Sequence, residues 1–241
     1  MALIFSNISS GSNTTNAISY TTSNITAEIN SWLLVSIASN NSGINGTASL
    51  LDTITDTSGN IYTLLSKTNR TAGVSNDGTT LGIWLGRITT ILNNGNITFN
   101  FSSDTSTKCY SIKKITVGNN EWVTPISIGN GFTGSGTAFS ASAISVISGY
   151  TIFGATAMES YSDIIVDSDT TNVSWSTAYS IIANNGGSHT LSQSLSTQQK
   201  TVTATGNQTY NTSTGSTRNR NWALNTIIFA PTRAKSIIFV L

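Results

Sequence analysis

Short apolar runs alternate with clusters of Asn, Ser, Thr and Gly along the whole chain. Residues 31–38 form an almost continuous apolar run that stops at the Asn-, Ser- and Gly-rich stretch 39–43, which predicts a buried central strand. Residues 97–101 alternate between apolar and polar side chains, as a half-buried strand does. No stretch keeps a helical period over three turns. The pattern predicts an all-β chain.

The remaining apolar runs predict further strands between turn clusters. They lie at residues 50–55, 61–65, 81–88, 109–117, 142–148, 150–158, 163–169, 173–179, 190–195, 200–205 and 221–229. The turn residues 56–60 predict that the strands on either side of them form a hairpin. The glycine-dense stretch 129–136 reads as an interdomain linker or as a long loop, and unchanged composition across it favours a loop. We therefore expect a single large antiparallel β-sandwich, jelly-roll-like, over residues 1–231.

Composition narrows the classes of function. Charged residues make up 9% of the chain, against about 25% in an ordinary soluble domain, and the net charge is +1. The Lys and Arg residues are scattered, so we expect no nucleic-acid partner. The N-terminus lacks the basic region of a signal peptide, and no run approaches the roughly 20 apolar residues of a membrane span. These features predict a soluble protein made in the cytoplasm without a signal peptide, with no membrane partner.

The sequence has one cysteine and one histidine, which limits the nucleophilic catalytic sites that it can form. Cys109 stands in an alternating stretch and is expected to be a buried thiol on a strand. His189 lies in a Gly- and Asn-rich loop-like segment. A Cys–His catalytic pair stays open as an alternative, because a thiol nucleophile needs a base.

Two groups of carboxylates invite functional hypotheses. Asp163, Asp167 and Asp169 have the clustered oxygens that calcium prefers, but their spacing fits no EF-hand, and a solvated strand face is the simpler interpretation. Asp52 and Asp56 suggest the paired carboxylates of a glycoside hydrolase. The simpler interpretation is that Asp56 caps the turn that follows it. We expect no metal, no cofactor and no catalytic residues.

The five tryptophans divide by their sequence surroundings. Trp32, Trp84 and Trp222 stand inside apolar runs and are expected in the core. Trp122 and Trp175 are the better candidates for an exposed platform that binds a glycan.

The order of motifs resembles a loose group of tailed-phage virion β-sandwich proteins, found as capsid decoration proteins, head fibres or tail-associated proteins. The resemblance rests on the opening Met1-Ala2-Leu3-Ile4-Phe5, the run 31–35, the segment 56–64, the Trp84 strand and the closing residues 221–231. It covers most of the chain and supplies no catalytic residue. It implies a structural, non-enzymatic protein of the virion surface, most simply a capsid decoration protein, with other virion subunits (capsid or tail protein) and copies of itself as partners. A tail-fibre or carbohydrate-binding module that recognises host glycans is the first alternative, and a glycoside hydrolase is the second.

Residues 232–241 depart from that pattern. Pro231 lacks the N–H that a central strand needs, and the chain then runs through a short polar spacer into an apolar segment. That segment consists of Ile237, Ile238, Phe239, Val240 and Leu241. Exposed, such a segment invites edge-to-edge strand pairing, so it must be covered. It is either a last strand of its own sandwich or an arm that binds a neighbouring subunit.

Overall fold

The computed structural model of the protein describes residues 3–40, 51–71, 78–117, 122–128 and 131–230. Every helix or strand assigned within these ranges is a β-strand, and every pairing between strands is antiparallel. The expected all-β class with antiparallel sheets is confirmed, although the sheets form two packed sandwiches where a single one was expected. No helix within these ranges could cross a membrane.

Ten strands belong to the first half of the chain. They are β1 (Ile4–Asn13), β2 (Ala17–Thr21), β3 (Ile25–Ala27), β4 (Trp32–Asn40), β5 (Leu51–Asp56), β6 (Tyr62–Thr71), β7 (Gly78–Arg87), β8 (Leu92–Gly95), β9 (Ile97–Thr105) and β10 (Lys108–Thr116). The first inner sheet has the order β1-β10-β4-β7-β6. The first outer layer consists of two smaller sheets, β2-β9-β5 and β3-β8.

Eleven strands belong to the second half. They are β11 (Pro125–Ile128), β12 (Phe132–Gly136), β13 (Ala138–Ser140), β14 (Ile144–Val146), β15 (Thr151–Met158), β16 (Ile164–Ile165), β17 (Tyr179–Ala183), β18 (Gln193–Thr201), β19 (Gly206–Gln208), β20 (Asn211–Thr214) and β21 (Arg220–Phe229). The second inner sheet has the order β11-β21-β15-β18-β17, with β12 also paired to β21. The second outer layer consists of β13-β20-β16 and β14-β19.

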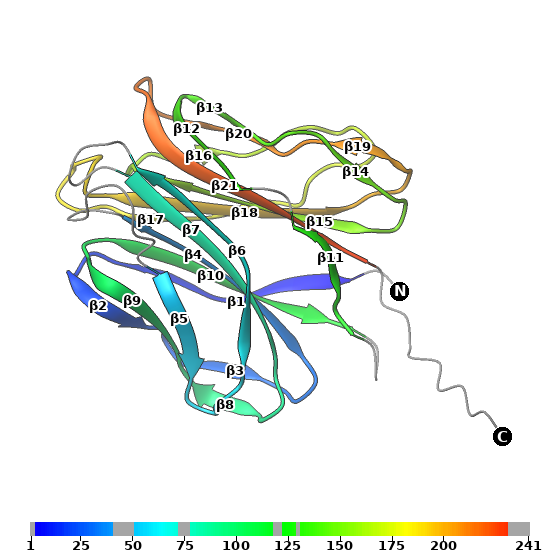
Figure 1. The fold of residues 1–241 in the computed structure, drawn as a ribbon, viewed down its shortest axis with the longest axis horizontal. Coiled ribbons are helices and arrows are strands. Elements are labelled where there is room, and N and C mark those ends of the chain that lie inside the picture. Colours follow the sequence, from blue (N-terminus) through cyan, green and yellow to red (C-terminus); the bar gives the residue numbers. More distant parts are fainter. Residues whose placement is uncertain (1–2, 41–50, 72–77, 118–121, 129–130, 231–241) are drawn as a thin grey trace.

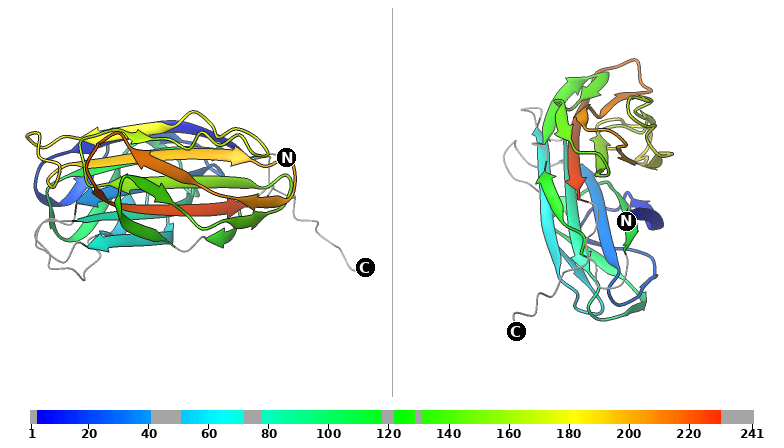
Figure 2. Two further views of the ribbon diagram at one scale, coloured as in Figure 1. Left: turned by 90° about the horizontal axis from the view of Figure 1, so that it is seen from above. Right: turned by 90° about the vertical axis from the view of Figure 1, so that its right-hand side faces the viewer.

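The sheets stack in four layers, so two sandwiches pack together through their inner sheets (Figure 1). The inner strands run along the length of the molecule (Figure 2). Three apolar cores fill the spaces between layers. The middle core joins Leu34 and Ile83 of the first inner sheet to Phe153 and Ile227 of the second. The two lateral cores lie between each inner sheet and its own outer layer.

Burial on both faces explains the apolar run that begins at Trp32. Successive side chains of a strand point to opposite faces. Leu33 and Val35 therefore enter the first lateral core, while Leu34 enters the middle core. All nine residues of β4 are buried, as expected for a strand with a sheet or layer packed on each side.

The two halves repeat one topology. In each inner sheet, the strand that opens the half pairs with the strand that closes it. In sheet order, β1, β10, β4, β7 and β6 of the first half correspond to β11 with β12, β21, β15, β18 and β17 of the second half. The outer layers correspond in the same way, three strands and two strands in each half. The turns before β4 and β15 also match. Asn30 (φ 71°) donates its N–H to Ile88 O at 2.8 Å, and Gly149 (φ 85°) donates its N–H to Val202 O at 2.7 Å.

The predicted hairpin at residues 56–60 is wrong. β5 pairs with β9 in the first outer layer, whereas β6 pairs with β7 in the first inner sheet. The turn therefore carries the chain from one layer to the other. Sequence pattern alone shows that two strands flank a turn, but the same pattern fits strands on opposite sides of one core.

The glycine-dense stretch is neither a linker nor a loop where the structure describes it, because residues 132–136 form β12. Gly134 lies against Trp222: a Cβ at this glycine would come within 2.6 Å of the indole ring. The glycine thus lets the strand pass closely over a large aromatic side chain.

Two further strand predictions need correction. The separate strands expected at 190–195 and 200–205 are one strand, β18, whose polar middle is buried. Its polar side chains find partners there: Gln198 accepts the N–H of Asp167 at 2.9 Å, and Gln193 donates to Thr79 Oγ1 at 2.8 Å. The strand expected at 173–179 is irregular, and the regular strand there, β17, begins only at Tyr179.

Candidate functional site

Asp56 is a structural cap, as the simpler interpretation of its sequence position predicts. Its Oδ1 accepts the N–H groups of Ser58 and Asn60 at 2.9 and 3.1 Å, and its Oδ2 accepts the Tyr62 hydroxyl at 2.9 Å. Burial, and then the neighbouring carboxylate, raise the pKa of Tyr62. Asp52 is exposed on β5. The arrangement at Asp56 directs its carboxylate oxygens into the turn rather than toward a substrate.

Asn60 holds the loop that follows β7. Its Oδ1 accepts the N–H of Thr89 at 2.8 Å and the N–H of Thr90 at 2.9 Å, and its Nδ2 donates to Thr90 O at 3.0 Å. Asn60 is 5% exposed. We call this arrangement an asparagine clamp, because one amide pairs with the backbone of two successive residues.

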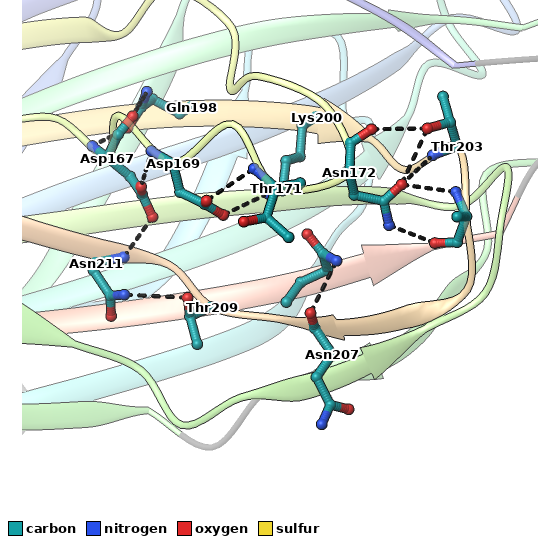
Figure 3. Close-up of polar contacts among 12 residues, drawn as sticks. Asp167, Asp169, Thr171, Asn172, Gln198, Lys200, Thr203, Asn207, Thr209 and Asn211 are labelled. Atoms are coloured by element: carbon teal, nitrogen blue, oxygen red, sulfur yellow. Dashed lines mark hydrogen bonds and ion pairs between the residues drawn. The ribbon is translucent and has the colours of Figure 1, made fainter.

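The second half contains the same clamp (Figure 3). Asn172 Oδ1 accepts the N–H groups of Thr203 and Ala204 at 3.1 and 2.7 Å, and its Nδ2 donates to Ala204 O at 2.5 Å. The preceding aspartate also matches, because Asp169 Oδ1 accepts the N–H of Thr171 at 2.8 Å. The sequence holds a signal of this repeat, Asp-Thr-Ser-Gly-Asn at 56–60 and Asp-Thr-Thr-Asn at 169–172, which the sequence analysis missed.

The aspartates at 163, 167 and 169 do not share a solvated strand face, because β16 ends at Ile165. Asp167 is 5% exposed and accepts the N–H groups of Asp169 at 2.8 Å and of Asn211 at 2.7 Å. Asp169 Oδ2 lies 3.3 Å from Lys200 Nζ (Figure 3). Hydrogen bonds from Thr171, with Lys200 as a smaller influence, lower the pKa of Asp169. Within the described residues no three such side chains form a metal-binding group.

Cys109 is a buried thiol on β10, as predicted. Its Sγ donates to Gln193 O at 3.1 Å, and burial raises its pKa, which keeps it in the unreactive thiol form. His189 instead pairs with Ser160, whose Oγ lies 2.8 Å from Nδ1, and its ring stacks on Tyr161 with 3.9 Å between centroids. Partial burial and the nearby Arg220 and Arg218 lower the pKa of His189. Ser160 is fully buried, so its hydroxyl supports the loop.

A small polar pocket of about 120 Å³ lies beside this pair, at the end of the molecule where β21 begins. Its lining residues are Glu159, Thr190, Asn219, Arg220 and Asn221. Glu159 Oε2 accepts the N–H of Gly78 and the Asn221 amide, both at 2.7 Å. Sequence pattern does not reveal this pocket, because its residues come from three separate segments of the chain.

The two tryptophans proposed as a glycan platform differ. Trp122 is 42% exposed, but Arg87 lies over its ring at 4.3 Å and Trp32 meets it edge-on at 5.7 Å. Trp175 is 7% exposed and packs against Tyr210 in the second lateral core, so its prediction as a surface residue is wrong. Trp175 lies in an irregular segment, so the polar residues next to it in the sequence do not indicate whether its indole ring is buried. Trp32, Trp84 and Trp222 are buried, as predicted.

Exposed apolar side chains gather at the opposite end, which we call the apolar end. Eight of the eleven large apolar side chains exposed among the described residues lie where β1, β4 and β6 begin and where β7 and β21 end. They are Ile4, Ile29, Ile61, Leu64, Ile91, Trp122, Ile126 and Ile147. A soluble protein rarely leaves so many large apolar groups exposed together unless another surface covers them.

The tail residues Ile237, Ile238, Phe239, Val240 and Leu241, proposed as a strand or an arm, lie outside the described residues. The last described residue, Ala230, is at the apolar end, where it donates its N–H to Thr124 O at 3.3 Å.

Comparisons with protein-family models, with curated proteins and with solved structures found no match. The resemblance to phage virion proteins therefore stays a prediction.

Proposed function

We propose that the chain is a non-enzymatic structural protein of a virion surface, most simply a capsid decoration protein, which meets other particle subunits through its apolar end. The single observation that carries this proposal is the concentration of exposed apolar side chains at one end of the four-layer body. Burial of each large apolar side chain contributes roughly 1.5–3 kcal/mol, so a few of them suffice for a stable contact.

The rest of the molecule suits a structural role. The three cores and the continuous inner sheets make a stiff body, and the carboxylates at Asp56, Asp167 and Asp169 are used in turns. The net charge of +1 lets neighbouring copies approach without strong repulsion.

Particles produced by the genome that encodes this chain provide the test. We expect the protein in gradient-purified particles at a fixed ratio to the shell protein, with antibody labelling on the outside. Ile61→Asp combined with Ile91→Asp should abolish its incorporation. Ile18→Asp and Ile165→Asp, at positions 60% and 53% exposed away from the apolar end, are the matched controls and should leave incorporation unchanged. Absence of the wild-type protein from the particles would refute the proposal.

Glycan recognition is a second candidate, favoured by the polar pocket. A carboxylate, a guanidinium group and two amides on one small concave surface are groups that pair with sugar hydroxyls. Calorimetric titration with a glycan panel tests it. Binding that is lost in Arg220→Met and kept in Asn207→Ala, a surface control, would support this function, and no binding to any glycan would remove it.

A further inference from the structure

Three exposed isoleucines of the first sandwich form the part of the apolar end that we call the isoleucine face. Ile29, Ile61 and Ile91 are 53%, 81% and 50% exposed. They lie on three neighbouring loops, which precede β4, precede β6 and follow β7. The first two loops contact the third, which consists of residues 88–91.

Hydrogen bonds fix these loops relative to one another. Arg87 Nη2 donates to Asn30 Oδ1 at 2.6 Å, beside Ile29. Ser58 Oγ donates to Ile91 O at 2.9 Å, and the Asn60 clamp holds the residues just before Ile91. The isoleucine face is therefore preorganised, which lowers the entropic cost of binding a partner.

The second sandwich shows what the fold itself requires at these positions. Ser148 precedes Gly149 as Ile29 precedes Asn30, and Thr205 follows the second clamp as Ile91 follows the first. Both polar residues have local partners, because the Ser148 N–H donates to Thr205 Oγ1 at 3.1 Å and the Ser148 hydroxyl donates to Thr203 O at 2.8 Å.

The third pair of equivalent positions in the two sandwiches also has the larger, more exposed apolar residue in the first sandwich. Val173 follows Asn172 as Ile61 follows Asn60, and Val173 is partly covered where Ile61 is almost fully exposed. The repeated topology thus forms with smaller or polar side chains at all three positions. The fold therefore does not require isoleucine at these positions of the first sandwich. Three exposed isoleucines there indicate a contact with another surface.

The chain itself holds an apolar segment that starts from this end. After Ala230 come the spacer residues 231–236 and then the five apolar residues 237–241. A spacer of this length spans at most about 20 Å when extended. It therefore brings the apolar segment within reach of a neighbouring molecule that docks at the same end.

We infer that the isoleucine face binds residues 237–241 of a second copy of this chain, and that each copy donates its own segment in return. The inference rests on the proposed function, in which the apolar end is an assembly surface, and names the partner at that surface. A mutual exchange covers both apolar surfaces and also joins two copies in a closed assembly, as the two-fold exchange of an identical element does. Binding within one chain would cover the same surfaces but join nothing.

Disulfide crosslinking tests the contact directly. Two full-length chains are made, one with Ile61→Cys and one with Val240→Cys, distinguished by different N-terminal tags, and are mixed and mildly oxidised. The native Cys109 does not interfere, because it is buried. We expect a disulfide-linked pair that carries both tags, at about twice the 25.3 kDa of one chain. Ile165→Cys mixed with Val240→Cys is the matched control and should give no mixed pair.

The outcomes separate this inference from the proposed function. A chain that carries both Ile61→Cys and Val240→Cys and closes only an internal disulfide would overturn the exchange between copies, as would equal crosslinking in the control. Deletion of residues 236–241 should convert the wild-type assembly into single chains, and an unchanged molar mass would also overturn the inference. A crosslinked pair that never enters particles would refute the proposed function alone.

Discussion

The first and second sandwiches are built on one plan and differ where they meet solvent. Both have a five-strand order in the inner sheet, a three-plus-two outer layer, a matched turn before β4 and β15, and an asparagine clamp at Asn60 or Asn172. At the apolar end, however, the first sandwich places isoleucines where the second has Ser148, Val173 and Thr205. The shared features are those that the fold needs, and the differing ones are candidates for function.

A second difference lies inside the molecule. Lys113 on β10 points into the space between the inner sheets, is 5% exposed, and has its Nζ 5.8 Å from the ring centre of Tyr179. The equivalent position on β21 is Ile227, a fully buried member of the middle core. The registers agree, because Lys113 lies two residues before Ile115, which pairs with Trp32, and Ile227 lies two residues before Phe229, which pairs with Thr151.

The largest expected effect tests whether the two sandwiches unfold together. Trp84→Ala in the first lateral core and Trp222→Ala in the second should each lower the free energy of unfolding by about 3–5 kcal/mol. Both variants should show one urea transition with the wild-type slope, because the shared middle core couples the halves. Trp122→Ala, at an exposed ring, should change stability by less than about 1 kcal/mol. Two separate transitions would show that each half unfolds on its own.

The clamps should contribute similarly but not equally. Asn60→Ala and Asn172→Ala each leave backbone groups of a loop without their partner, at a cost of about 1–3 kcal/mol. The effect of Asn60→Ala should be the larger, because Asn60 is buried and Asn172 is partly exposed. Asn207→Ala, at the exposed middle residue of β19, is the control and should fall within about 0.5 kcal/mol of wild type. Urea denaturation of the three variants checks this order, and a neutral Asn60→Ala would argue against a structural role for the clamp.

The buried lysine should make stability depend on pH. Burial lowers the pKa of Lys113 from 10.5 to about 8, so between these values the unfolded chain binds more protons than the folded one. The free energy of unfolding should therefore rise as the pH increases from about 8 to 10. Burial also lowers the pKa of Lys108 to about 8, which adds to this rise. The raised pKa of Cys109 opposes it from about pH 9, and the raised pKa of Tyr20, about 12, opposes it above pH 10.

Lys113→Met should remove part of this rise and stabilise the protein at pH 7 by about 1–2 kcal/mol, since it makes the position apolar as Ile227 is. Lys114→Met is the matched control, because Lys114 is the next residue, is partly exposed and pairs with Glu28 at 3.2 Å. It should change stability by at most about 0.5 kcal/mol. A Lys113→Met variant with the wild-type pH profile would show that the lysine is solvated in the folded protein.

Periodicity and turn residues were enough to predict the all-β class and most strands of the inner sheets. The run at β4 and the alternation at β9 follow directly from burial on two faces or on one. The buried tryptophans in apolar runs were predicted for the same reason, and the Asp56 cap follows from local turn chemistry.

Features that depend on distant partners were not predicted. The polar strand β18 is buried because Gln193 and Gln198 find partners on other segments, which no local pattern reveals. Trp175 is buried by the packing of an irregular segment, and the turn at 56–60 joins two layers where local pattern suggests a hairpin. The apolar end combines loops from both halves, so it becomes visible only when the strands are in register.

One pair of equivalent substitutions tests the central claim, that the two sandwiches share a fold and that the first carries the assembly surface. Ile91→Asp and Thr205→Asp place the same charge on the same loop of the two repeats, and both positions are exposed. Sedimentation equilibrium should give the wild-type assembly mass for Thr205→Asp and the 25.3 kDa of a single chain for Ile91→Asp. Equal masses for the two variants would contradict the assignment of assembly to the first sandwich.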